Sequence, residues 1–186
     1  MLITLIRHSK TKLEKDIPNV LWNLTEEGVE LAQQLSLKQE IKDVNVLYSS
    51  LQTKALHTSI LLAKDNYIPL KTNPDLTELT SITQNFIENF ESEVKKLYYG
   101  ETERINEGES IKEGLLRFNH AIEEIVKVEK DASNIGIVAH GNILSIFSAQ
   151  FIDMSPYEIH YIIKMPDIAI LDWDSKKFIK FFGDLS

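Results

Sequence analysis

Short apolar runs alternate along this chain with longer segments whose apolar residues recur at helical spacing. The runs at 2–6 and 135–139 are continuously apolar, which is typical of strands buried on both faces of a parallel sheet. The pattern predicts further strands at 44–48 and 68–72, and helices at about 25–37, 50–64, 82–100, 110–126 and 142–151. This alternation predicts an α/β fold with three layers, α/β/α, around a mostly parallel central sheet.

The end of the chain follows a different pattern. Residues 168–173 and 178–182 are two apolar runs on either side of a polar turn at 174–176, which predicts a C-terminal β-hairpin. The polar stretch 101–110 is the segment that we expect to be most mobile. The chain has 186 residues, a length typical of one domain, so residues 1–186 are interpreted as a single domain.

Helix boundaries and buried faces follow from single residues. Thr25 is expected as an N-cap, and either Ser110 or Glu109 is expected to begin the helix predicted at 110–126. Either Ser49 or Ser50 is expected to cap the helix that runs to about residue 64. The buried stripe of that helix is predicted to include Ile60. The inner face of the helix after Ser110 is predicted to include Leu116.

Composition excludes several classes of function. A formal charge of −8 argues against nucleic acid and anionic membranes as partners. The absence of cysteine excludes thiol nucleophiles, disulfides and cysteine-bound metals. No apolar stretch approaches the roughly 20 residues of a membrane span. Arg7 and His8 interrupt the first apolar run, so a signal peptide is not expected. We therefore expect a cytoplasmic location.

Polar residues with useful chemistry follow two of the predicted strands. Arg7 and His8 end the first apolar run, and His140 and Gly141 follow the run at 135–139. Ligands of open α/β sheets bind at the carboxyl ends of the strands, so we expect these groups to meet. One arginine and two imidazoles suit an anion such as phosphate. Neither histidine has a partner at metal-ligand spacing, so no metal site is expected.

Six short segments occur in a defined order: Leu5–Thr11, Asn23–Gly28, Ser49–Ser59, Pro74–Glu78, Gly108–Ser110 and Val138–Asn142. In that order they resemble the RHG signature, the LTExG element, the SSPLxRAxxTA helix start, the L-x-E acid segment, the GES element and the second-histidine motif of one family. That family is the histidine phosphatase superfamily, the phosphoglycerate-mutase-like proteins. The resemblance covers most of the chain. Residues 79–108 depart most from it and would form a variable covering segment that selects the leaving group.

The resemblance implies roles for particular residues. His8 would be the nucleophile and form a phosphohistidine. Glu78 would protonate the leaving oxygen and then accept a proton from water. His140 would stabilise the phosphoryl oxygens, most usefully as an imidazolium. Further phosphate contacts are expected from Arg7, Lys54, Thr11, Gly141 and Asn142. Such a site would need neither a metal ion nor a cofactor.

The chain departs from the family pattern at three positions. Lys54 stands where the family has arginine, which keeps the charge but loses the two-pronged geometry. Ser9 replaces a glycine, so the loop after His8 is expected to follow another path. Glu14 replaces an asparagine, and we expect its carboxylate to turn away from phosphate. Thr11 would either bind phosphate or stabilise its own turn.

Other residues are interpreted as structural. His120 and His160 belong to no motif, and Trp22 is expected to pack rather than to wall a pocket. Ser49 and Ser50 are read as helix caps rather than ligands.

The sequence therefore predicts a phosphate monoester hydrolase that acts on a small phosphorylated substrate or a phosphoprotein. Phosphatase is preferred to mutase because Arg104 and Arg117 are the only arginines besides Arg7, and 82–108 is acidic. Three alternatives stay open. They are a degenerate member that binds a phosphorylated ligand or protein without turnover, a phosphoglycerate-mutase-type phosphoryl transferase, and a metal-dependent hydrolase.

Overall fold

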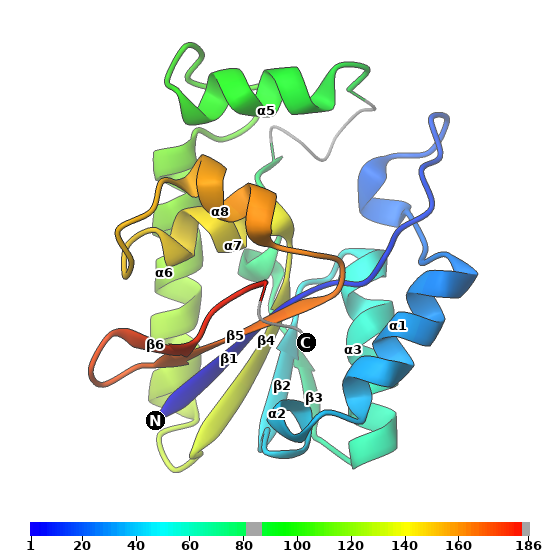
Figure 1. Ribbon diagram of the computed structural model, residues 1–186, viewed down its shortest axis with the longest axis vertical. Helices are drawn as coiled ribbons and strands as arrows, with labels where there is room; N and C mark the ends of the chain where they lie inside the picture. The colour runs from blue at the N-terminus through cyan, green and yellow to red at the C-terminus, as the bar shows by residue number, and fades with distance from the viewer. Residues whose placement is uncertain (81–86, 184–186) are drawn as a thin grey trace.

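The computed structural model describes residues 1–80 and 87–183, and they form a sheet flanked by helices on both faces (Figure 1). The strands are β1 (Leu2–Arg7), β2 (Val46–Ser49), β3 (Leu70–Thr72), β4 (Asn134–Ala139), β5 (Asp167–Asp172) and β6 (Lys177–Lys180). Their order in the sheet is β3-β2-β4-β1-β5-β6. Strands β1 to β4 run parallel to one another, whereas β5 runs antiparallel to both of its neighbours, β1 and β6. The predicted mixed sheet with a C-terminal hairpin is confirmed.

The helices form the two outer layers. They are α1 (Glu26–Ser36), α2 (Gln39–Lys42), α3 (Thr53–Asn66), α5 (Phe90–Tyr98), α6 (Ile111–Val128), α7 (Gly141–Ser148) and α8 (Pro156–Ile162), with short 3-10 turns η1 (Asn19–Leu21) and η2 (Pro74–Leu76). Helices α1, α2 and α3 cover one face of the sheet, and α6, α7 and α8 lie on the other (Figure 1). Helix α5 lies beyond the sheet, at the top of that view.

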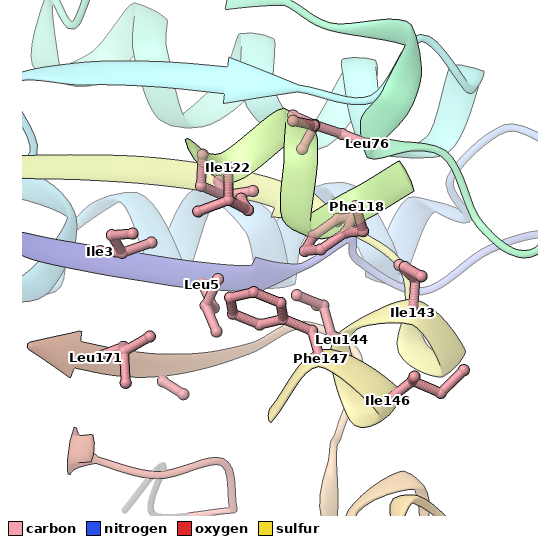
Figure 2. Close-up of a cluster of buried hydrophobic side chains, with 14 of the residues drawn as sticks. Ile3, Leu5, Leu76, Phe118, Ile122, Ile143, Leu144, Ile146, Phe147 and Leu171 are labelled. Atoms are coloured by element: carbon pink, nitrogen blue, oxygen red, sulfur yellow. The ribbon is translucent and has the colours of Figure 1, made fainter. Parts of the chain in front are cut away.

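Each face of the sheet has its own hydrophobic core. The smaller core joins Ile6 and Val138 to Leu35 of α1 and Leu62 of α3. In the larger core, Phe118 of α6 packs edge-on against Phe147 of α7, with ring centroids 5.2 Å apart. Figure 2 shows these rings beside the side chains of β1. Two cores on opposite faces explain why most residues of β1 and β4 are apolar on both sides of the sheet.

Several local predictions are wrong, for identifiable reasons. Gln52 is the N-cap of α3, and Ser50 instead accepts a hydrogen bond from the Gln52 amide at 3.3 Å. Ile60 is 46% exposed and Leu116 is 72% exposed, because each lies just outside the buried stripe of its helix. Thr25 is an N-cap as predicted. Of the two residues predicted to begin α6, Ser110 is its N-cap and forms a capping box with Glu113.

The remaining differences concern the lengths of helices and two short helices. The helix predicted at 142–151 ends at Ser148, and α2 and α8 were not predicted. Of the helix predicted at 82–100, residues 82–86 lie outside the described residues, and the rest contains α5. In the described ranges, no helix combines the length and apolar character required to cross a membrane.

Candidate active site

The sheet brings the two strand-end histidines together. Strands β1 and β4 are adjacent and parallel with Arg7 opposite Ala139, so His8 and His140 leave the sheet at the same level. The amide of His8 donates to the carbonyl of Ala139 at 3.0 Å. The ring centroids of His8 and His140 are 5.2 Å apart. The expected meeting of the two imidazoles therefore follows directly from strand register.

A hydrogen bond fixes the tautomer of His8. Its Nδ1 lies 2.8 Å from the carbonyl oxygen of Ser9. A carbonyl can only accept, so Nδ1 carries the proton and Nε2 carries the lone pair. Burial, followed by the nearby charges of Lys54 and Arg7, holds the pKa of His8 well below its usual range. The ring is therefore neutral at neutral pH, which is the form that a nucleophile requires.

His140 is fully buried beside His8. Its Nε2 lies 2.8 Å from the hydroxyl of Ser50, and its Nδ1 has no hydrogen-bond partner in the described part of the chain. Burial first, and then His8, Lys54 and Arg7, hold its pKa well below the usual value. His140 is therefore neutral at neutral pH, which differs from the imidazolium expected from the sequence. Complete desolvation is the reason for the difference.

Arg7 is held by the chain around it. One terminal nitrogen donates to the carbonyl of Ile163 at 2.6 Å, while its buried Nε has no partner among the described residues. A Cβ atom added to Gly141 would lie 2.9 Å from Cζ of Arg7. Glycine at position 141 therefore lets the guanidinium lie against the start of α7. The unused N–H of Arg7 is suited to an anionic oxygen.

These groups border a cavity of about 460 Å³. Seven of the eight predicted site residues line it: Arg7, His8, Thr11, Lys54, Glu78, Gly141 and Asn142. The eighth, His140, lies behind His8 rather than on the lining. Other lining residues are Leu13, Asn19, Trp22, Ile87, Glu88, Phe90, Glu91, His160 and Met165.

Glu78 reaches from the segment after η2 to the N-terminus of α7. One carboxylate oxygen accepts from the amides of Leu79 at 3.0 Å and Ile143 at 2.9 Å. The other accepts from the amide of Asn142 at 3.0 Å and its side-chain nitrogen at 3.1 Å. The hydroxyl of Tyr98 donates to Oδ1 of Asn142 at 3.0 Å, which fixes that side chain. Asn142 was expected to bind phosphate. Its backbone and side-chain N–H groups donate to Glu78 instead.

Lys54 projects from the first turn of α3 into the cavity. Its Nζ donates to the carbonyl of Asn19 at 3.0 Å and to the Asn19 side-chain oxygen, and it lies 5.6 Å from the ring centroid of Trp22. Burial lowers the pKa of Lys54 to about 8, and Arg7 acts in the same direction while Glu78 opposes it. Asn19 and Trp22 therefore belong to the site. No sequence signal indicated Asn19, and Trp22 lines the cavity although it was expected only to pack.

The loop after His8 accommodates the departures from the family pattern. The hydroxyl of Ser9 donates to the carbonyl of Gly28 at 2.6 Å, so serine is fully buried and hydrogen-bonded there. A Cβ on Gly28 would lie 2.1 Å from the carbonyl oxygen of Lys10, so glycine is required for this close approach. Thr11 lines the cavity and also donates to the carbonyl of Ser9 at 3.2 Å.

Glu14 does not line the cavity. Its carboxylate pairs with the ammonium of Lys12 at 3.1 Å. The carboxylate is therefore directed to the surface, as expected from the sequence.

An ion pair that the sequence did not reveal positions Glu78. Arg117 of α6 pairs with Glu109, and both side chains are largely buried. Arg117 also donates to the carbonyls of Thr77 at 3.2 Å and Glu78 at 3.4 Å. Glu109 accepts from the amide of Thr80 at 3.0 Å. This gives the GES element a physical role, since its glutamate and α6 clamp the segment that carries Glu78.

His160 was interpreted as structural, yet it lines the cavity. Burial and the charge of Arg7 lower its pKa to about 4, against an opposing effect of Glu91. Its place in the sequence gives no signal, because α8 reaches the site only through tertiary packing. Among residues 1–80 and 87–183, no group of three or more histidine, aspartate or glutamate side chains is arranged to hold a metal ion.

The arrangement can be compared with known proteins. The chain is similar in structure to YhfR of Bacillus stearothermophilus, with 21% identity and a TM-score of 0.78 over 100% of this chain and 98% of that one. It is also similar to a mycobacterial glucosyl-3-phosphoglycerate phosphatase, with 16% identity and a TM-score of 0.77 over 100% and 99%. A third is the alpha-ribazole phosphatase of Shigella flexneri, with 22% identity and a TM-score of 0.74 over 98% and 95%.

At these identities the structures demonstrate a shared fold. Comparison with curated proteins gives no match. The family model of the histidine phosphatase superfamily (branch 1) matches residues 3–182, which is nearly the whole chain. The chain belongs to the histidine phosphatase superfamily, branch 1.

Proposed function

We propose that this protein hydrolyses phosphate monoesters through a phosphohistidine on His8. The observation that carries the proposal is the state of His8, a neutral ring whose Nδ1 is held by the Ser9 carbonyl. Beside it lies Arg7, with a buried N–H that has no partner in the described ranges. A fixed nucleophile next to an unused cationic donor is suited to a phosphoryl group. Two of the structurally similar proteins are themselves named phosphatases.

In the first step, Nε2 of His8 attacks phosphorus and the bond from phosphorus to the ester oxygen breaks. Arg7 and Lys54 attract the phosphoryl oxygens, and Glu78 in its protonated form transfers a proton to the departing alcohol. The phosphorylated ring carries a positive charge, which the Ser9 carbonyl stabilises at Nδ1.

In the second step, water attacks phosphorus and transfers a proton to Glu78, and the bond from phosphorus to nitrogen breaks. Inorganic phosphate leaves, and His8 returns to its neutral form. The reaction needs no metal ion in this scheme, because the charge is held by side chains.

One feature favours the rival function, a member that binds without turnover. All four lone pairs of the Glu78 carboxylate accept N–H hydrogen bonds, so it must leave some of these contacts to donate a proton. Mutase activity has less support, because Arg7 is the only arginine on the cavity lining in the described ranges.

Hydrolysis of p-nitrophenyl phosphate in the presence of EDTA tests the proposal. The wild-type protein should release p-nitrophenol, and His8→Ala should reduce the rate to background. His120→Ala is the matched control, because His120 is an exposed histidine on α6. Activity lost on chelation and restored by a divalent metal would support the metal-dependent reading. Vanadate binding without turnover of a broad phosphoester panel would support the binder.

A further inference from the structure

The two ends of the cavity differ in charge. Arg7 and Lys54 lie at the buried end, next to His8. Glu88 and Glu91, on the approach to α5 and in its first turn, are exposed carboxylates on the outer lining. Five other side chains on the lining are apolar or aromatic: Leu13, Trp22, Ile87, Phe90 and Met165. A phosphate is thus attracted to one end, while a second anion at the other end would meet two carboxylates.

No positive group in the described part of the lining compensates Glu88 and Glu91, since Arg7 and Lys54 are its only cations. Lys10 and Lys12, close to His8 in sequence, pair with Glu27 and Glu14 and are not on the lining. The sequence from 81 to 86 contains no charged residue. The outer end of the cavity is therefore acidic.

A smaller cavity of about 180 Å³ adjoins the first and shares Glu91 and His160 with it. Tyr157 and Tyr161 line this second cavity, and their ring centroids are 5.1 Å apart. The ring of Tyr99 lies 5.3 Å from that of Tyr157. Tyrosine faces attract ammonium groups, so Glu91 stands beside a surface that also favours a cation.

We propose that the preferred substrate is a phosphate monoester whose alcohol carries an ammonium group, and that Glu88 and Glu91 select it. The inference rests on the proposed phosphatase activity of His8. The phosphoryl group lies against Arg7 and Lys54, the carbon skeleton crosses the apolar wall, and the ammonium group faces Glu91. Sugar bisphosphates and phosphorylated carboxylic acids are disfavoured, because their second anion faces the same carboxylates.

Three aryl phosphates that differ in charge at the para position test this inference. They are para-aminomethyl-, para-hydroxymethyl- and para-carboxymethyl-phenyl phosphate, whose leaving groups have similar basicity. We expect kcat/KM to fall in that order, with about a tenfold ratio between the ammonium and carboxylate substrates, since exposed carboxylates act through solvent. The ratio should decrease as the salt concentration rises.

The variant Glu88→Gln/Glu91→Gln should bring the three substrates to similar kcat/KM values, with a loss for the ammonium substrate and a gain for the carboxylate. Glu93→Gln is the control, because Glu93 lies on the same helix but pairs with Lys96 and lines neither cavity. If the neutral substrate is hydrolysed but the kcat/KM values of the three substrates do not follow their charge, the inference is overturned and the proposed phosphatase activity stands. An order by charge that the double variant preserves would also overturn it. Failure to hydrolyse even the neutral substrate would instead reject the proposed function.

Discussion

At the scale of single residues, the site depends on which side chains are charged. His8 and His140 are held neutral by burial, so the positive field at the proposed phosphate position comes from Arg7 and Lys54. Of these two, Lys54 has the pKa closer to neutrality, at about 8. Lysine in place of arginine at this position therefore gives the site a dependence on pH that arginine would not.

Lys54→Arg tests this dependence. In the wild-type protein, kcat/KM should fall above about pH 8, because deprotonated Lys54 no longer attracts the phosphate, and kcat/KM reports on the free enzyme. In Lys54→Arg the decrease should move beyond pH 10, since arginine keeps its charge there, and vanadate should bind more tightly. Lys12→Arg, on the surface, should keep the wild-type profile. An unchanged profile in Lys54→Arg would show that Lys54 does not contact the phosphate.

Glu78→Gln tests the acid role. The amide cannot donate a carboxyl proton, so hydrolysis of phenyl phosphate, a poor leaving group, should slow by on the order of a hundredfold. Hydrolysis of p-nitrophenyl phosphate should slow much less, because p-nitrophenolate leaves with little protonation. General disruption of the α7 contacts would slow both substrates alike. Equal slowing is therefore the result that contradicts the acid role.

At the scale of elements, the start of α7 organises the site. Its first residue, Gly141, leaves space for Arg7, and its next two amides hold Glu78. The clamp of Arg117 and Glu109 brings Glu78 to that helix end. One helix N-terminus thus positions both Arg7, which is proposed to bind phosphate, and Glu78, the proposed acid.

Gly141→Ala should separate the effect of α7 on Arg7 from its effect on Glu78. The added methyl would overlap the guanidinium of Arg7, so the inhibition constant of inorganic phosphate should rise roughly tenfold, the loss of one charged hydrogen bond. Because the buried guanidinium must shift to make room, the thermal midpoint should fall by a few degrees. Competition assays and thermal melts check the two expectations. Unchanged phosphate inhibition would indicate that Arg7 does not contact the phosphoryl group.

At the scale of the whole molecule, the sequence predicted what depends on strand order and strand ends. Arg7, His8 and His140 meet because adjacent parallel strands end at one level, and apolar periodicity alone indicates such strands. Contacts between distant elements were not visible. Ser50 reaches His140, and Arg117 reaches the carbonyl of Glu78, through packing that no local pattern encodes. The neutral state of His140 likewise arises from burial, which depends on the completed fold.

Burial of His160 makes folding depend on pH. Its pKa is about 4 in the folded protein and about 6.5 when unfolded, so between these values the unfolded chain binds the extra proton. Acid therefore favours unfolding. The contribution of His160 to stability is complete above about pH 6.5 and is lost as the pH falls towards 4, by at most about 1.4 kcal/mol per pH unit.

His160→Gln removes this titration while His8 and His140 remain in both proteins. The free energy of unfolding, measured with urea from pH 7.5 to pH 4.5, should decrease less steeply for the variant than for the wild type. Above pH 7 the difference between the two proteins should be nearly constant, because folded histidine is neutral there and most of the unfolded histidine is neutral too. Parallel curves over the whole range would mean that His160 is hydrated, and hence that α8 does not close this side of the cavity.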